Sequence, residues 1–405
     1  MSEVPTQISA TNAERVVLHV LSLREALAGT NARGWDESAC PATLTPEKAK
    51  ALASNPASVS EDQPAQLIGT RGRRVVGRMD LVAGDLVVHR GHRESHVPIL
   101  WGSNLFVPPA ERKSLVGAML LMKAASLFPT VGAHGPSQLA LPLYEKLAFA
   151  KIPLDRHILL RRSRSIARRY FGDGLTGKTA SVVGDIGLLG LRAVNAARGL
   201  LSGAKLARVP SMPSEFDGAL RAGVCNGGVQ RHANGTPEKP ATAIRCLRSV
   251  EWINWLLAHS FGCDLDQTNR RHERALFLLE SRRGVPLGYI LMKVRFHAKA
   301  THRAFPDLTL ATLADWGSFD GRVDFSPLFA SAAIRAAAEL KADALEICTQ
   351  PAEETAKMLR VYGFVRAGIM NAMVKANSES ALSPVPYTTP SNWTIRYGDG
   401  ENVFG

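Results

Sequence analysis

The stretch VPPAERKSLVG, residues 107–117, joins a segment typical of a strand to a segment typical of a helix. The residues before it, 96–107, are rich in Val, Ile and Leu, whereas 108–128 open with two prolines and a glutamate and continue with apolar residues at helical spacing. The first turn of a helix has N–H groups without intrahelical acceptors and carries the positive end of the helix dipole. Together with Arg112, such a junction is suited to hold an anion.

The elements around this junction follow the order β-β-β-α-β-α-β. Its segments are 65–71, 74–90, 96–107, 108–128, 130–137, 138–149 and 150–160. Within the second strand we expect a turn near Gly84, because glycine interrupts an otherwise apolar run there.

The second half of the chain repeats this order. Its segments are 274–281, 285–297, 308–319, 325–342, 344–350, 352–364 and 365–376, and the tail 392–404 is predicted as one more strand and a turn. The tripeptide WGS at 101–103 recurs at 316–318, which is 215 positions later, and Phe149 recurs as Phe364 with the same offset. Equal order and equal spacing indicate an internal duplication.

The predicted fold class is α+β (α/β), with two tandem domains that each contain a mixed, mostly antiparallel twisted sheet flanked by helices. We expect an N-terminal domain at 1–160, a basic and partly helical connector at 161–212, and a C-terminal domain at 213–405.

The loop at 107–117 resembles the V-x-P-x-x-R-x-x-G-x-G motif of the GNAT superfamily of acyl-CoA-dependent N-acyltransferases. Val107, Pro109, Arg112 and Gly117 match the motif, and Leu115 stands where its first glycine is expected. The likeness covers 65–160 well and 250–376 more weakly. A side chain at position 115 would crowd the phosphates of a bound cofactor, so the resemblance leaves the cofactor affinity open.

The resemblance implies that the first domain binds acetyl-CoA or another acyl-CoA. The residues that would hold it are Phe106, Val107, Arg112, Lys113, Ser114, Leu115, Val116 and Gly117. In that family the fourth and fifth strands separate and the pantetheine arm pairs with the fourth strand. A backbone N–H near Phe106 or Val107 would then stabilise the oxyanion.

A second motif, SQLALPLYEKLAF at 137–149, resembles the family's helix that ends in A-x-x-x-Y-x-x-x-G-F. Tyr144 matches the tyrosine that protonates the leaving thiolate, and Ala148 replaces the glycine. For the general base we name His134, because an imidazole titrates near neutral pH, and Asp80 as an alternative.

The second half has lost these groups. With the offset of 215, Arg112 corresponds to Pro327 and Tyr144 corresponds to Leu359. The second domain is therefore predicted to be degenerate and to bind no cofactor.

The formal charge of +13 and the pI of about 9.8 indicate an anionic partner or ligand. An aminoacyl-tRNA-dependent transferase of the same fold would use the five arginines within 161–169, but nucleic acid is not favoured, since the retained loop suits a pyrophosphate. A non-catalytic regulatory or scaffold protein is the third alternative. The acceptor is expected to be a small-molecule or saccharide amine, such as an amino sugar or a surface-polysaccharide precursor, and the oligomeric state is open.

Several other patterns are interpreted as accidental. Residues 172–179 match the phosphate loop G-x-x-x-x-G-K-[ST], but an arginine-rich segment precedes them in place of a buried strand. His89, His92 and His96 lie beside a predicted turn, and no metal site is expected there.

Composition and the N-terminus add three further expectations. The five scattered cysteines do not suggest disulfides. The N-terminus has no secretion signal, and the apolar stretch 181–201 contains charges that argue against a membrane span. We therefore expect a cytoplasmic protein.

Overall fold

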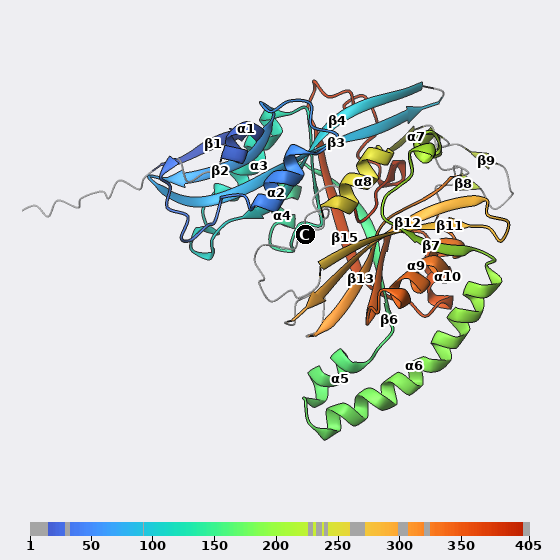
Figure 1. The fold of residues 1–405 in the computed structure, drawn as a ribbon. Coiled ribbons are helices and arrows are strands. Elements are labelled where there is room, and N and C mark those ends of the chain that lie inside the picture. Colours follow the sequence, from blue (N-terminus) through green and yellow to red (C-terminus); the bar gives the residue numbers. More distant parts are fainter. Residues whose placement is uncertain are drawn as a thin grey trace, which may run out of the picture.

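The structure is a computed structural model that describes residues 15–28, 33–91, 93–225, 230–231, 237–238, 242–259, 272–298, 307–319 and 325–399. Figure 1 shows two lobes joined by one continuous sheet, with a helical arm below the second lobe.

The first half contains the elements that the sequence predicted and three more before them. They are β1 (Val16–Ser22), α1 (Leu23–Ala28), α2 (Pro46–Ala53), β2 (Pro64–Arg71), β3 (Arg74–Arg90), β4 (Arg93–Phe106), the 3-10 turn η2 (Pro109–Glu111), α3 (Val116–Leu127), β5 (Thr130–His134), α4 (Leu141–Lys146) and β6 (Ala150–Leu160).

A connecting region follows, and it leads to the second half. It comprises α5 (Arg164–Phe171), α6 (Leu175–Leu201), β7 (Lys205–Val209), η3 (Ser214–Phe216), α7 (Asp217–Cys225), the small pair β8 (Gln230–Arg231) and β9 (Pro237–Glu238), β10 (Thr242–Cys246) and α8 (Val250–Ala258).

The second half then repeats the order of the first. Its elements are β11 (His272–Glu280), β12 (Pro286–His297), β13 (Leu308–Ser318), α9 (Pro327–Glu339), β14 (Ala344–Thr349), α10 (Glu353–Val361), β15 (Val365–Ala376), η4 (Pro390–Asn392) and β16 (Trp393–Thr394).

The main sheet has the strand order β1-β2-β3-β4-β5-β15-β6-β14-β13-β12-β11-β7. Strands β2, β3, β4, β5 and β6 of the first half correspond to β11, β12, β13, β14 and β15 of the second. With each strand replaced by its counterpart, these ten strands have the same order when the sheet is followed from either edge. The element order of the two halves and this palindrome support the internal duplication.

The two halves exchange their last strands in the middle of the sheet. β15 pairs antiparallel with β5 and β6, and β6 in turn pairs with β14. β6 and β15 therefore cross the centre of the molecule side by side (Figure 1). Each half completes its sheet with a strand from the other, so the two halves depend on each other for their backbone hydrogen bonds.

Successive residues of the first half's strands are buried on both faces of the sheet. Leu67 and Leu81 pack under α3, whereas their neighbours Ile68 and Val82 belong to a second cluster that includes Trp252 of α8. The strands of the first half therefore have a nearly continuous apolar sequence, as doubly covered strands do.

Three details differ from the sequence prediction. β3 runs through Gly84 without a turn, because its second part pairs with β10, a strand that the sequence analysis did not predict. At Gly84 the missing side chain makes room for the Trp101 ring, whose Nε1 would lie 3.0 Å from an added Cβ. The predicted helix at 108–128 begins only at Val116, because residues 109–111 form a separate 3-10 turn.

The segment that matches a phosphate loop is a turn between two helices. Gly172 ends α5 with a φ of 73°, and α6 begins at Leu175. An added Cβ at Gly177 would lie 1.9 Å from the carbonyl oxygen of Gly172, so this glycine permits a tight turn. α5 occupies the place where a nucleotide-binding loop needs a buried strand, which confirms the interpretation as an accidental match.

A substitution at Gly132 tests the packing at the centre of the sheet. An added Cβ there would lie 2.5 Å from the buried Trp101 ring, so we expect Gly132→Ala to lower the free energy of unfolding by about 1–3 kcal/mol. In α6 an added Cβ at Gly187 would have no atom within 4 Å. We therefore expect Gly187→Ala to raise the free energy of unfolding by about 0.5–1 kcal/mol. Urea unfolding of both variants measures these changes. Equal stability of Gly132→Ala and the wild type would contradict this packing.

Candidate functional site

A gap in the sheet begins beside β4. β4 and β5 are parallel and pair only at Leu100–Val131, Trp101–Gly132 and Gly102–Ala133. Beyond these pairs β4 continues for four residues with β3 as its only described neighbour in the register. This arrangement agrees with the separation of the two strands that the sequence resemblance implied.

A bulge lies on β4 at the start of this gap. The register between β3 and β4 shifts between Arg78 and Asp80, and Asn104 has a φ of 50°. A bulge redirects the backbone groups of its strand, and bulges are frequent beside functional sites.

The loop after β4 leads to the N-terminus of α3. Arg112, Lys113 and Leu115 are exposed, and Leu115 has 75% of its surface accessible. The Val116 N–H donates to Ser114 Oγ at 3.4 Å, whereas the N–H groups of Gly117 and the next residue have no acceptor among the described residues.

Ion pairs fix the position of this loop. The Glu111 carboxylate forms ion pairs with two arginines, at 2.7 Å from Oε1 to Arg74 Nη2 and at 3.2 Å from Oε2 to Arg71 Nη2. The Glu111 side chain is mostly buried. Since Glu111 is neutralised by two arginines, the positive charges of Arg112 and Lys113 remain available to an anion at the helix N-terminus.

α4 packs against the start of α3. An added Cβ at Gly117 would lie 3.4 Å from Leu143 Cδ2, an ordinary van der Waals distance. Tyr144, the next residue of α4, is 3% exposed and lies edge-on to Phe149 with ring centroids 5.0 Å apart. The helix with the predicted acid therefore adjoins the helix with the predicted phosphate loop.

The two other predicted site groups lie on either side of the gap. His134 ends β5, is fully buried, and is the register partner of Ala372 on β15. Phe106 ends β4 opposite Arg78, and Val107 follows it, with both side chains half-buried. The catalytic roles of Tyr144 and His134, and the binding roles of the loop residues, stay predictions.

A buried polar cluster lies under the bulge. Asp80 forms an ion pair with Lys48 and accepts hydrogen bonds from Gln66 Nε2 at 3.0 Å and Asn104 Nδ2 at 3.2 Å. Burial alone would raise the pKa of Asp80, but Lys48 and Arg78 outweigh this effect and hold the pKa below its ordinary value. Asp80 is thus a buried, paired carboxylate that fixes the bulge residue, which does not suit the alternative role of a base facing the acceptor.

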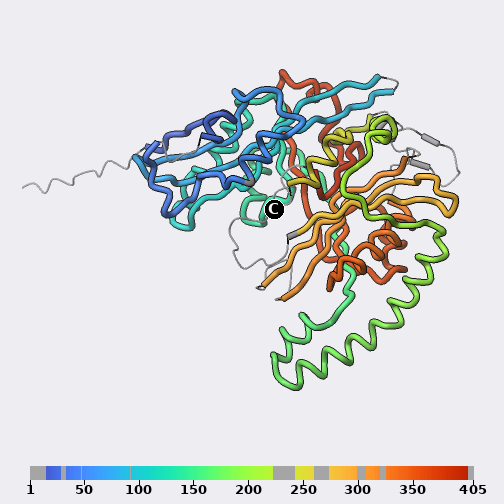
Figure 2. Tube along the Cα trace, viewed as in Figure 1, coloured from blue at the N-terminus to red at the C-terminus, as the bar shows by residue number. Residues whose placement is uncertain are grey.

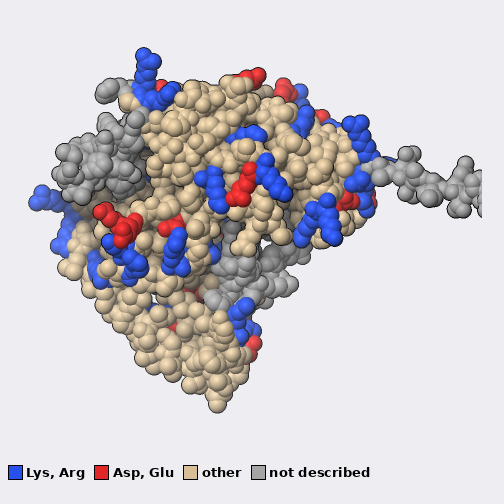
Figure 3. Space-filling model, turned by 180° about the vertical axis from the view of Figure 1, so that it is seen from behind, with Lys and Arg blue, Asp and Glu red and all other residues tan. Residues whose placement is uncertain are grey.

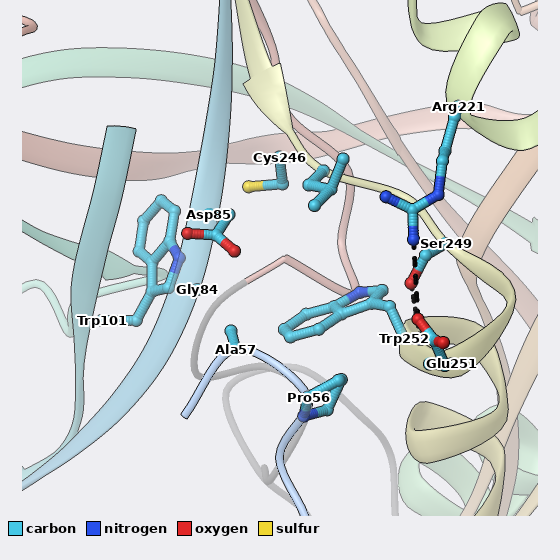
Figure 4. A pocket seen from close by; sticks show the side chains of 11 residues that line it. Pro56, Ala57, Gly84, Asp85, Trp101, Arg221, Cys246, Ser249, Glu251 and Trp252 are labelled. Carbon is cyan, nitrogen blue, oxygen red and sulfur yellow. Dashed lines mark hydrogen bonds and ion pairs between the residues drawn. The ribbon is translucent and has the colours of Figure 1, made fainter. Parts of the chain in front are cut away.

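A cavity of about 220 Å³ lies between the first half and the part of the connecting region that contains α7, β10 and α8 (Figure 4). Its walls come from the loop after α2, from β3 and β4, and from α7, β10 and α8. The lining residues are Pro56, Ala57, Gly84, Asp85, Trp101, Arg221, Cys246, Leu247, Ser249, Glu251 and Trp252. Burial raises the pKa of Asp85, whose carboxylate lies beside the Trp101 ring.

In the second half, the C-terminal segment lies against the corresponding gap. β13 and β14 pair only from Leu310–Ala344 to Thr312–Glu346. Beyond this point the Gly398 N–H donates to the Ala314 carbonyl oxygen at 2.6 Å, at a bulge of β13. The chain's own tail thus supplies a hydrogen bond where the first half has no described partner strand.

A mostly buried charge network holds this tail. Arg248 Nε lies 2.6 Å from Asp315 Oδ2, and Arg248 also pairs with Asp399. Arg396 Nη1 lies 2.8 Å from Asp315 Oδ1, and its guanidinium carbon lies 4.5 Å from the centre of the Trp316 ring. Burial alone would raise the pKa of Asp315, but both arginines outweigh it and hold the pKa below its ordinary value.

The described part of the chain contains no group of three or more His, Cys, Asp or Glu residues that could hold a metal ion. His89 Nε2 lies 2.6 Å from Arg245 Nη2, and His96 Nε2 lies 3.3 Å from Glu94 Oε1. His92 lies outside the described residues. Cys40, Cys246 and Cys348 are buried free thiols, whereas nothing is described for the side chains of Cys225 and Cys263.

The repeated element order and the gap beside a bulged fourth strand confirm the tandem GNAT-like fold that the sequence predicted. The exchange of the last strands was not predicted.

Comparisons with known proteins found likeness in structure only. No protein-family model matches the chain, and no curated protein matches its sequence. The solved N-myristoyltransferase of Saccharomyces cerevisiae with bound myristoyl-CoA is similar over 89% of this chain and 82% of its own, with 11% identity and a TM-score of 0.49.

Two further solved structures are similar over the same 89% of this chain. A tandem GNAT protein from the clavulanic acid biosynthesis pathway is covered over 98% of its length, with 12% identity and a TM-score of 0.45. A GCN5-related N-acetyltransferase from Anabaena variabilis is covered over 73%, with 11% identity and a TM-score of 0.45. At this distance the likeness says nothing of the activity, so the function is inferred below from this chain's own residues.

Sequence reasoning missed the polar cluster and the cavity. A signal for the cluster was present, because Arg78 and Asp80 alternate within a strand that is otherwise apolar. No local signal could have joined Asp85 to Trp252, since they are 167 positions apart in the sequence and β10, which pairs with β3 just before α8, was not predicted.

Arg248 tests the charge network of the second half. We expect Arg248→Met to lower the free energy of unfolding by about 3–5 kcal/mol, because it leaves two buried carboxylates without their shared cation. The matched change Arg283→Met, in an exposed turn between β11 and β12, should cost less than about 0.5 kcal/mol. Urea unfolding measures both, and equal midpoints for the two variants would contradict the role of Arg248.

Proposed function

We propose that this protein transfers an acyl group, such as acetyl, from acyl-CoA to an amine, and that the first half alone binds the acyl-CoA. The observation that carries the proposal is the set of free N–H groups at the start of α3, flanked by the exposed Arg112 and Lys113 and adjoining the gap beside β4. This combination suits a long ligand that has a diphosphate at one end and hydrogen-bonding amides along its arm.

Among the described residues, which leave out 320–324 before α9, the second half shows no such combination. α9 begins at Pro327, which has no N–H to donate, and Gly398 of the C-terminal segment bonds to the β13 strand at its gap. The proposal therefore assigns acyl-CoA to the first half, and a structural role to the second.

Acyl-CoA would supply a thioester with an activated carbonyl carbon. The loop from Phe106 to Gly117 would hold the diphosphate end, and the bulge that Asp80 fixes through Asn104 would aim strand N–H groups at the oxyanion. The amine nitrogen would form a bond to the carbonyl carbon as the bond from that carbon to sulfur breaks.

Two protons move in this reaction. The Tyr144 hydroxyl would donate one to the leaving thiolate, since α4 adjoins the start of α3. The amine loses the other to a base. We propose His134 or Asp85 for this role, since His134 ends β5 at the gap and Asp85 lines the cavity with a raised pKa.

We propose the cavity between the first half and the connecting region as the acceptor site. The Asp85 carboxylate and the rings of Trp101 and Trp252 favour a cationic amine, through charge and cation–π attraction, whereas Glu251 is paired with Arg221 at 3.6 Å. A volume of about 220 Å³ is below the ~300–1,000 Å³ of a drug-sized ligand site. The acceptor is then a small amine, of which an amino sugar or a polysaccharide precursor is one kind.

Binding of acetyl-CoA tests the cofactor site. We expect Arg112→Ala to raise the dissociation constant about tenfold, because it removes one charge-assisted contact to phosphate. The matched control Arg283→Ala, in an exposed turn of the second half, should bind as the wild type does. Isothermal titration calorimetry measures both, with ATP and bulk tRNA titrated in parallel.

Other results would overturn the assignment. Equal binding by Arg112→Ala and the wild type would remove the loop from the cofactor site. If the protein binds tRNA but does not bind acetyl-CoA, the aminoacyl-tRNA-dependent transferase is favoured. If it binds neither acetyl-CoA, ATP nor tRNA, a non-catalytic protein is favoured.

Tyr144 is tested by turnover. We expect Tyr144→Phe to retain acetyl-CoA affinity but to release CoA at least about a hundredfold more slowly in the presence of small amines, because general acids contribute ~10²–10⁴-fold. CoA release is followed with a thiol reagent. Phe at this position keeps the ring packed against Phe149, and thermal unfolding checks that the variant is folded. Unchanged turnover would remove Tyr144 from the mechanism.

A further inference from the structure

From Val182 onward, α6 has its polar side chains toward the protein and most of its apolar side chains toward solvent. Asp185 accepts the Ser163 N–H at 2.7 Å, Asn195 Nδ2 donates to the Tyr362 carbonyl oxygen at 2.9 Å, and Arg198 Nη1 donates to the Val361 carbonyl oxygen at 2.6 Å. Arg192 likewise donates to the Arg161 carbonyl oxygen. A surface helix of a soluble protein normally has the opposite orientation.

The exposed face of α6 from Val182 to its end contains only apolar or small residues. They are Val182, Val183, Ile186, Gly187, Leu189, Gly190, Ala193, Val194, Ala196, Ala197, Leu200 and Leu201. We call these residues the α6 apolar face. At 1.5 Å per residue this face is about 30 Å long, which exceeds what scattered surface apolar residues explain.

The tip of the arm extends this apolar surface. Tyr170 and Phe171 end α5 and Leu175 begins α6, and all three are more than half exposed. Figure 2 shows that α5 and α6 project away from the two lobes, and the lower projection in Figure 3 has a large surface without charged side chains.

Basic residues flank the tip. Arg162, Arg164 and Arg169 are exposed on α5 or just before it, and Lys178 is exposed in the first turns of α6. The one acidic residue at the turn, Asp173, accepts Arg168 Nη2 at 2.8 Å, and Asp185 faces the protein. The arm therefore combines an apolar face, exposed aromatic rings and an excess of positive charge.

We propose that α5 and α6 dock this protein onto an anionic lipid bilayer, with the α6 apolar face immersed at the headgroup level. Aromatic rings and arginines beside an apolar helix face are the features of interfacial helices. A second copy of the chain would cover the apolar face but would place the arginines of two positively charged proteins beside each other.

By length and composition α6 is also sufficient to cross a membrane. Crossing would remove Asp185, Asn195 and Arg198 from their partners on the protein and place them in hydrocarbon, which is costly. A helix that lies in the membrane surface keeps all of these bonds. The docking surface does not depend on whether the first half binds acyl-CoA.

Co-flotation with lipid vesicles tests the proposal. The full-length protein is mixed with vesicles of phosphatidylcholine, alone or with phosphatidylglycerol. We expect it to float with the anionic vesicles, and Ile186→Glu to reduce the bound fraction about tenfold, because it places a charge in the centre of the immersed face. Arg164→Gln should weaken binding to the anionic vesicles and leave binding to the vesicles of pure phosphatidylcholine unchanged.

The matched control is Val59→Glu, the same kind of change at an exposed residue in the loop before β2. It should float as the wild type does, and thermal unfolding should show that both glutamate variants are folded. The proposal is overturned if the wild type floats with neither vesicle, or if Ile186→Glu floats equally well. It is also overturned if light scattering finds a dimer that Ile186→Glu separates, since a second copy would then cover the apolar face.

Discussion

The pairing of β15 between β5 and β6 is the constraint on which the rest of the structure depends. Because β15 supplies partners to both neighbours, neither half has a complete sheet without the other. The same exchange places β6 against β14 and so fixes the second half relative to the first. The cavity has walls from β3, β4, β10 and α8 and lies where β10 pairs with β3.

Much of the fold could be predicted because the duplication repeats its pattern. The matching spacing around Trp101 and Trp316 fixes the order of elements twice, and local errors such as the expected turn at Gly84 do not change it. The strand exchange could not be predicted in this way. An exchanged strand and an unexchanged one have the same sequence, and only the contacts of the folded chain distinguish them.

The candidate site was predictable only in part, for a related physical reason. The loop from Val107 to Gly117 is local, so its residues identify it. The groups around it are brought together from distant segments, such as Lys48 and Asn104, which both contact Asp80. Glu111 shows the limit clearly, because the sequence marks it as a helix-start residue, whereas in the structure it neutralises Arg71 and Arg74.

The two gaps of the duplicated fold show what a separated strand requires. A strand that leaves its neighbour exposes backbone groups that need new partners. In the second half the Gly398 N–H meets the Ala314 carbonyl oxygen, and Arg248 and Arg396 hold that segment through Asp315. In the first half the described part of the chain provides no equivalent segment, while the bulge at Asn104 and the free N–H groups of α3 remain. Since one gap contacts the protein's own tail and the other has a helix N-terminus suited to an anion, we infer that duplication was followed by a division of roles, in which one half stabilises the molecule and the other accepts a ligand.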